Sequence, residues 1–179
     1  MKKNICITGL LNKYCENISQ LLAQELEVFF ADVIKFVQFD IVDISSTIDI
    51  CGINYYKGLV SKKLKELSKY EDVVIFANYY LLQYQECKNV FENDLITVYL
   101  DVGENQFNKL LIDENLSDLE SKIEKGAYKV RNKAFAKKCD IVVKCAGLND
   151  AQVVDKIKKA VIEYISKGVK NGIRRKNSK

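Results

Sequence analysis

The sequence predicts one α/β domain of three layers, in which helices cover both faces of a five-stranded parallel sheet. Five short apolar runs lack the alternation of half-buried strands, as expected for strands that are buried on both faces. Stretches with helical spacing of apolar residues separate these runs, which is typical of parallel sheets. No proline, repeat or low-complexity linker marks a second domain. We therefore expect residues 1–166 to form the domain and 167–179 to form a basic, flexible tail.

The predicted strands follow one another along the chain at 4–8, 28–32, 72–77, 95–100 and 140–143. Predicted helices fill the intervals at 16–26, 56–70, 81–91, 105–111 and 121–138, and a last helix covers 150–165. Ligands of such folds lie at the carboxyl ends of the strands, so a site is expected after Thr8, Phe30, Ala77 and Leu100.

The composition excludes several classes of protein and site. Of the 179 residues 48% are apolar, which suffices for a core at this length. No apolar run approaches a membrane span, and no cleavage site follows the start, so we expect a cytoplasmic protein without a membrane partner. The absence of histidine excludes Ser–His and Cys–His nucleophile pairs and histidine-ligated metals. Six cysteines without a C-x-x-C pair predict reduced thiols and no metal site.

The basic charge of the chain is concentrated at its C-terminal end. The net charge is +4, and six cations follow the last acid, Glu163. The other 22 basic residues face 24 acidic ones, so the remaining body carries −2. The body thus gives no electrostatic reason to expect nucleic-acid binding. A weak contact of the tail with RNA, DNA or an acidic partner stays open beside a solvated tail.

Residues 9–16, called here the first loop, have the setting of a phosphate-binding loop: a strand, a glycine and then a helix. The motif of such loops is G-x-x-x-x-G-K-S/T, in which backbone N–H groups and the lysine hold phosphates and the hydroxyl binds magnesium. Tyr14, Cys15 and Glu16 stand in place of the second glycine, the lysine and the hydroxyl residue. The sequence predicts a vestigial phosphate loop, with a degenerate Walker A motif, made of Gly9, Asn12, Lys13, Tyr14, Cys15 and Glu16.

The replacements weaken phosphate binding in different ways. A residue other than glycine resists a left-handed backbone at a cost of roughly 1–2 kcal/mol. Glu16 brings a carboxylate near a polyphosphate, and two like charges about 4 Å apart repel by roughly 4 kcal/mol near a protein surface. That repulsion exceeds the roughly 1.5–3 kcal/mol of one charge-assisted hydrogen bond. Two other interpretations stay open: a working phosphate site that uses Lys13, and an unrelated turn.

The order of these segments resembles shikimate kinase and its relatives among the nucleoside-monophosphate-kinase-like proteins, from residue 4 to about residue 165. In that family the loop G-F-M-G-S-G-K-S-T is followed by L-A-x-x-L and F-x-D-x-D. Here residues 9–17, LAQEL at 22–26 and FADVI at 30–34 keep this register without a gap. Further matches are GINYYK at 52–57 for G-E-x-x-F-R, VYLDV at 98–102, and RNKAFAKKCD at 131–140 for R-x-P-x-Y-x-E-x-A-D. The resemblance implies the P-loop nucleoside triphosphate hydrolase fold of the shikimate kinase type.

The resemblance also implies roles on the nucleotide side, where the family uses ATP and magnesium. Asp32 matches the acid near the magnesium, and Arg131 matches an arginine near the closed substrate site. The family's mobile lid carries an arginine that contacts the transferred phosphate. Between Leu110 and Leu119 this chain has no arginine and three acids, Asp113, Glu114 and Asp118.

On the substrate side the family's residues are replaced. Ile34 stands for the acid that grips the substrate hydroxyls, and Lys57 for the arginine that grips its carboxylate. Asn78, Tyr79 and Tyr80 stand for three glycines that let the substrate lie against the backbone. We interpret these tyrosines as filling the cleft, while an aromatic partner surface stays open.

Donor site, acceptor site and lid are thus all altered. We predict a non-catalytic, pseudokinase-like binding or regulatory module, to which the sequence assigns no cofactor and whose partner is an unidentified small molecule or protein. The alternative is an active ATP-dependent small-molecule kinase with a divergent site; its catalytic candidates are Lys13, Asp32 and Arg131, with Lys57 as an anion contact. Purely structural roles also stay open for these residues: Asp32 could cap a helix, and Arg131 and Lys57 could be solvated surface cations.

Overall fold

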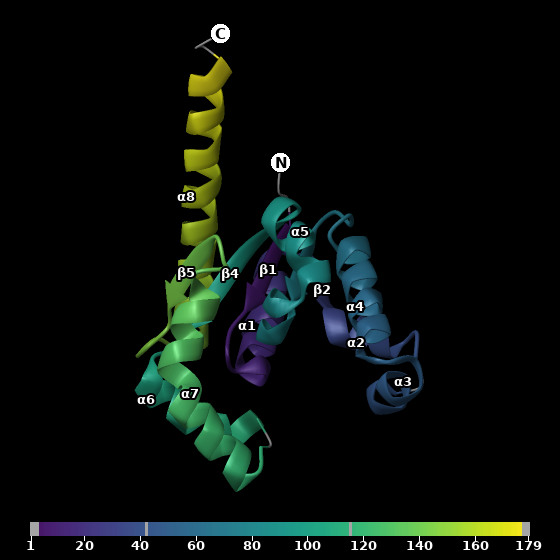
Figure 1. The fold of residues 1–179 in the computed structure, drawn as a ribbon. Helices are drawn as coiled ribbons and strands as arrows, with labels where there is room; N and C mark the ends of the chain where they lie inside the picture. Colours follow the sequence, from purple (N-terminus) through teal and green to yellow (C-terminus); the bar gives the residue numbers. More distant parts are fainter. Residues whose placement is uncertain (1–3, 42, 115, 177–179) are drawn as a thin grey trace.

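The computed structural model describes residues 4–41, 43–114 and 116–176, and helices flank both faces of its sheet (Figure 1). The sheet contains five strands, all parallel, in the order β2-β3-β1-β4-β5. The strands are β1 (Asn4–Thr8), β2 (Phe29–Asp32), β3 (Val73–Phe76), β4 (Leu95–Asp101) and β5 (Ile141–Lys144). The predicted fold class and the five predicted strands are confirmed, each to within one residue at either end.

Two apolar cores lie on opposite faces of the sheet, because successive side chains of a strand point to opposite sides. On β1, for example, Ile7 belongs to one core and Cys6 to the other. The first core packs against α1 (Asn12–Glu25), α6 (Glu104–Leu110), α7 (Asp118–Ala136) and α8 (Asp150–Lys176). The second packs against α2 (Val33–Gln38), α4 (Ile53–Leu67) and α5 (Gln85–Asn93). Burial on both faces explains the unbroken apolar runs of β1, β3 and β4. The edge strands β2 and β5 are partly exposed, so for them the expected burial on both faces is wrong.

Side-chain caps start several of the helices, among them α2, α3 (Ile44–Cys51) and α7. Asp32 caps α2, and Asp43 caps α3 by accepting a hydrogen bond from the backbone of Ser46. Ser117 and Glu120 form a capping box at the start of α7. Helices α2 and α3 were not predicted. The first is short, and the second has β-branched residues and no buried position, so neither gives a clear helical pattern.

Several helix boundaries differ from the prediction. Helix α1 begins at Asn12 rather than near residue 16, and a 3₁₀ helix, η1 (Tyr79–Gln83), precedes α5. Helix α8 continues past residue 165, so the backbone of residues 167–176 is helical, whereas residues 177–179 of the predicted tail lie outside the described part of the chain. None of the helices in the described ranges is long and apolar enough to cross a membrane.

Candidate functional site

The first loop lies at the carboxyl end of β1, the central strand of the sheet. The helical elements α6 and α7 lie to one side of this end of the sheet, and α2 and α3 lie to the other (Figure 1). The predicted site residues come from the first loop and from the segments that follow β2 and β3. Arg131 and the acidic segment 110–119 come from the α6–α7 region. The topology therefore gathers most of the predicted site at one end of the molecule.

The first loop is mostly helical. Only Gly9, Leu10 and Leu11 separate β1 from α1, and both leucines are buried in the first core. The backbone N–H of Cys15 already donates to the carbonyl of Leu11 at 3.0 Å. At the position of the motif lysine, the backbone N–H is therefore used within the helix. Tyr14 in place of a glycine lets the helix start early, since glycine disfavours a helix interior.

Cys15 packs back against Gly9. Its side chain is 1% exposed, and a Cβ atom added at Gly9 would lie 2.7 Å from Cys15 Sγ and 3.0 Å from the carbonyl oxygen of Leu100. Glycine is needed at position 9 because there is no space for a side chain. Burial raises the pKa of the Cys15 thiol well above its usual value, which keeps the group protonated and unreactive.

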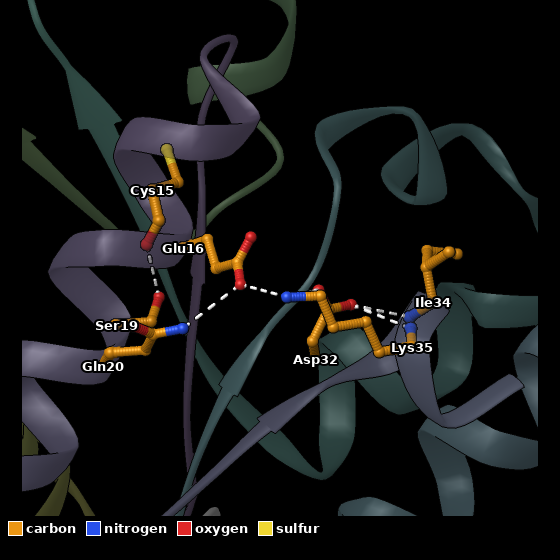
Figure 2. A network of polar contacts seen from close by, with 7 residues as sticks. All are labelled: Cys15, Glu16, Ser19, Gln20, Asp32, Ile34 and Lys35. Atoms are coloured by element: carbon orange, nitrogen blue, oxygen red, sulfur yellow. Dashed lines mark hydrogen bonds and ion pairs between the residues drawn. The ribbon is translucent and has the colours of Figure 1, made fainter. Parts of the chain in front are cut away.

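Glu16 belongs to a polar network between α1 and α2 (Figure 2). Its carboxylate forms an ion pair with the ammonium group of Lys35 and accepts a hydrogen bond from Gln20 Nε2 at 3.2 Å. The Lys35 side chain is half exposed, whereas that of Glu16 is mostly buried. The negative charge at the position of the motif hydroxyl is thus balanced from α2.

Asp32 ends β2 and caps α2. Its Oδ1 accepts hydrogen bonds from the backbone N–H groups of Ile34 at 2.9 Å and Lys35 at 3.2 Å (Figure 2). The residue is 6% exposed, and burial raises the pKa of its carboxyl group, while the two backbone hydrogen bonds oppose that rise. These contacts favour the cap interpretation of Asp32. Ile34, in the first turn of α2, is half-buried.

A carboxylate from the lid region reaches the first loop. Glu114 lies in a short 3₁₀ helix, η2 (Leu111–Glu114), and its Oε1 accepts a hydrogen bond from the backbone N–H of Lys13 at 2.9 Å. Burial raises the pKa of Glu114, and hydrogen bonds from the backbone of Lys13 and Asn12 counteract this. Lys13 itself is exposed in the first turn of α1. An acid of the lid thus stands at the helix terminus where the family's motif binds phosphate.

The tyrosines after β3 form a row of aromatic rings. Tyr79 packs edge-on against Phe135 of α7, with centroids 5.1 Å apart, and against Tyr80 at 6.0 Å. Tyr80 continues the row to Tyr84 at 5.9 Å, and the ammonium group of Lys57 lies 5.2 Å from the centroid of the Tyr84 ring. Asn78 precedes the row as the residue immediately before η1. Lys57 therefore contacts an aromatic face.

Arg131 pairs with Glu124 of the same helix, α7. Its guanidinium group also interacts with the Tyr79 hydroxyl; burial raises the pKa of that hydroxyl, and Arg131 partly opposes the rise. Of the four charged residues that the active-kinase alternative would use, three have a side-chain contact: Asp32 with the start of α2, Lys57 with Tyr84, and Arg131 with Glu124. Lys13 contacts Glu114 through its backbone N–H, and its side chain is exposed.

Three residues at this site were not predicted: Lys35, Glu114 and Phe135. Lys35 was missed because α2 was missed, and Phe135 contacts Tyr79 only through the fold. Glu114 gave a usable signal, since it is an acid in a segment where the resemblance calls for an arginine. Within the described ranges no cluster of three or more acids and cysteines could hold a metal ion.

Comparison with known proteins shows that the sequence and the fold of this chain are similar to those of one group of kinases. No family model matches the chain. The shikimate kinases of two strains of Clostridium botulinum, Alaska E43 and Eklund 17B, are each 25% identical to it over 167 residues, which covers 90% of this chain and 99% of each relative.

Solved structures of shikimate kinases have the same fold. The enzyme of Acinetobacter baumannii in complex with shikimate has a TM-score of 0.74 at 15% identity and covers 91% of this chain and 94% of its own. That of Bacteroides thetaiotaomicron has a TM-score of 0.75 at 16% identity and covers 89% and 98%. The dephospho-CoA kinase of Campylobacter jejuni is less similar, with a TM-score of 0.56 at 14% identity over 94% and 99%. The chain therefore has the shikimate kinase-like fold of the P-loop kinases.

Proposed function

We propose that this chain is a non-catalytic relative of the shikimate kinases that acts as a binding or regulatory module. The observation that carries the proposal is the burial of Cys15 at the position of the phosphate-binding lysine. The motif needs a cation there that reaches the terminal phosphates. A protonated thiol packed against Gly9 offers no such cation, and the space around it is already filled.

The position of the magnesium-binding hydroxyl supports the same conclusion. Glu16 occupies it, and Lys35 neutralises its carboxylate. A metal ion at this carboxylate would lie beside the ammonium group of Lys35 and be repelled by it. Asp32, the other acid expected near the metal, is engaged as the cap of α2.

The acceptor side and the lid also lack the expected groups. Half-buried tyrosines stand where the family has glycines, and they pack on one another and on Phe135. Arg131 is paired within its own helix. In P-loop enzymes an arginine on the transferred phosphoryl group contributes about 10³–10⁵ in rate. The concerted loss of such groups leaves little transition-state stabilisation.

Binding and turnover can be tested separately on the purified chain. We expect no heat of binding in calorimetry with ATP and magnesium, and no ADP formation when shikimate is added. A shikimate kinase such as that of Acinetobacter baumannii serves as the positive control. Micromolar affinity for ATP would overturn the proposal. ADP formation that depends on shikimate would instead support the alternative of an active kinase built on Lys13, Asp32, Lys57 and Arg131.

A further inference from the structure

The contact between Glu114 and Lys13 joins two segments that are 101 residues apart in the sequence. The short helix η2 anchors one side of this contact, because Leu111 is 3% exposed and packs in the first core. Ile112 is 81% exposed and Asp113 is exposed as well, so neither holds η2 against α1. Of the four residues of η2, Leu111 and Glu114 are therefore the two that fix it to the body.

The other side of the contact is the N-terminus of α1, a helix of 14 residues. The first N–H groups of a helix have no partner within it, and the helix dipole adds a partial positive charge there. Leu11, the residue before α1, provides no side-chain cap, and the first turn contains no acid. The carboxylate of Glu114 supplies from a distant segment the negative group that α1 lacks locally.

This terminus is also where the phosphate-binding loop of the fold presents its N–H groups to an anion. The side chain of Glu114 is shielded enough that burial alone raises its pKa, whereas the N–H groups of α1 favour its charged form. The nearest like acid of the same segment, Asp113, is exposed to solvent. Glu114 therefore differs from its neighbour in both burial and contact.

We propose that Glu114 is an intramolecular latch, whose carboxylate occupies the anion position at the N-terminus of α1 and holds residues 111–114 closed over the first loop. This inference rests on the proposed function, because a resident carboxylate takes the place of a nucleotide that the loop no longer binds. Opening the latch would free the N–H groups of Asn12 and Lys13 and release η2 together. The latch makes the lid and the first loop one coupled unit.

Amide hydrogen exchange of Glu114→Ala, compared with the wild type, tests the latch. We expect the exchange of the Lys13 amide and of the amides at 111–114 to rise by roughly tenfold, since one charge-assisted hydrogen bond is lost. Inorganic pyrophosphate should then slow exchange at residues 12–14 in the variant and leave the wild type unchanged. Asp113→Asn is the matched control and should exchange like the wild type. Glu114→Gln keeps an acceptor oxygen without the charge, should give an intermediate result, and replaces the alanine variant if that variant does not fold.

Three results would overturn the latch: unchanged exchange in both Glu114 variants, the same increase in Asp113→Asn, or faster exchange without any protection by pyrophosphate. In the last case Glu114 would be only a helix cap. The proposed function fails by a different result, namely binding of ATP and magnesium to the wild-type chain.

Discussion

Glu16 and Lys35 form an ion pair that joins the first turns of α1 to the start of α2 (Figure 2). Because Lys35 is 55% exposed, solvent screens the pair, and exposed pairs contribute about 0.2–1 kcal/mol. We expect a double-mutant cycle with Glu16→Gln and Lys35→Met, followed by urea unfolding, to give a coupling free energy in this range. The exposed pair Lys88–Glu92, at 3.9 Å, is the control and should couple more weakly. Equal coupling in the two pairs would contradict this prediction.

Gly9→Ala tests the close packing at the start of the first loop. The added methyl group would meet Cys15 Sγ and the carbonyl oxygen of Leu100, so the free energy of unfolding should fall by about 1–3 kcal/mol. Adding Cys15→Ala should restore part of this loss, because one of the two clashes is removed. Gly126→Ala, in α7 with open space around the new methyl group, should instead stabilise the chain by about 0.5–1 kcal/mol. A similar loss in both glycine variants would show that packing at Gly9 is not special.

The Asp32 carboxyl group should make stability depend on pH. Its pKa is raised in the folded chain, chiefly by burial, so the folded state holds the proton more tightly than the unfolded state. The stability of the wild type should therefore fall as pH rises from the ordinary pKa of an aspartate through the raised one. Asp32→Asn removes this dependence and keeps an acceptor for the cap, so its stability relative to the wild type should rise as pH rises from the ordinary aspartate pKa through the raised one.

Asp43→Asn provides a comparison with the opposite sign for this pH experiment. Hydrogen bonds from Ser46 lower the pKa of Asp43, so its charged form is the favoured one in the folded chain. Relative to the wild type, this variant should lose stability as pH rises from the lowered pKa of Asp43 to the ordinary pKa of an aspartate, and should change little above that pH. Urea unfolding below, at and above the ordinary aspartate pKa measures both trends. Parallel trends in the Asp32 and Asp43 variants would contradict the assignment of burial as the dominant effect at Asp32.

Tyr79→Ala should interrupt the aromatic row between η1 and α7. The half-buried ring contacts both Tyr80 and Phe135, so its removal should lower the free energy of unfolding by about 2 kcal/mol. Tyr79→Phe keeps both ring contacts and should cost less than about 1 kcal/mol. Tyr55→Ala, at a 52% exposed position, should change stability by less than about 0.5 kcal/mol. Chemical denaturation of the three variants would check this order.

The sequence predicted most of the framework because the strands carry an unmistakable signal. Val73 and its neighbours in β3 are buried on both faces, and such runs are readable without a structure. Helix α3 was missed because its residues have low helix propensity and none is buried, so it depends on the Asp43 cap and on packing against its neighbours. The pattern of apolar residues along the chain therefore identifies the elements that are buried throughout. It does not identify elements that depend on a cap and on contacts with neighbouring elements.

The candidate site was less predictable. The altered motif positions, such as Cys15 and Glu16, could be found from their spacing after Gly9. Their contacts could not be found, because Lys35 and Glu114 reach the first loop from elements far along the chain. Sequence spacing reports which groups are present at a site, whereas the partners of those groups depend on tertiary structure.

The packing of Cys15 against Gly9 also bears on how such a chain could change over evolutionary time. A single substitution to lysine would place a long charged side chain where sulfur already touches the backbone turn, so folding would suffer before phosphate affinity improved. The helix start at Asn12 and the side chain of Tyr14 would have to change with it. Under the proposed function, a change of this loop into a nucleotide-binding one would therefore require several substitutions together rather than Cys15→Lys alone.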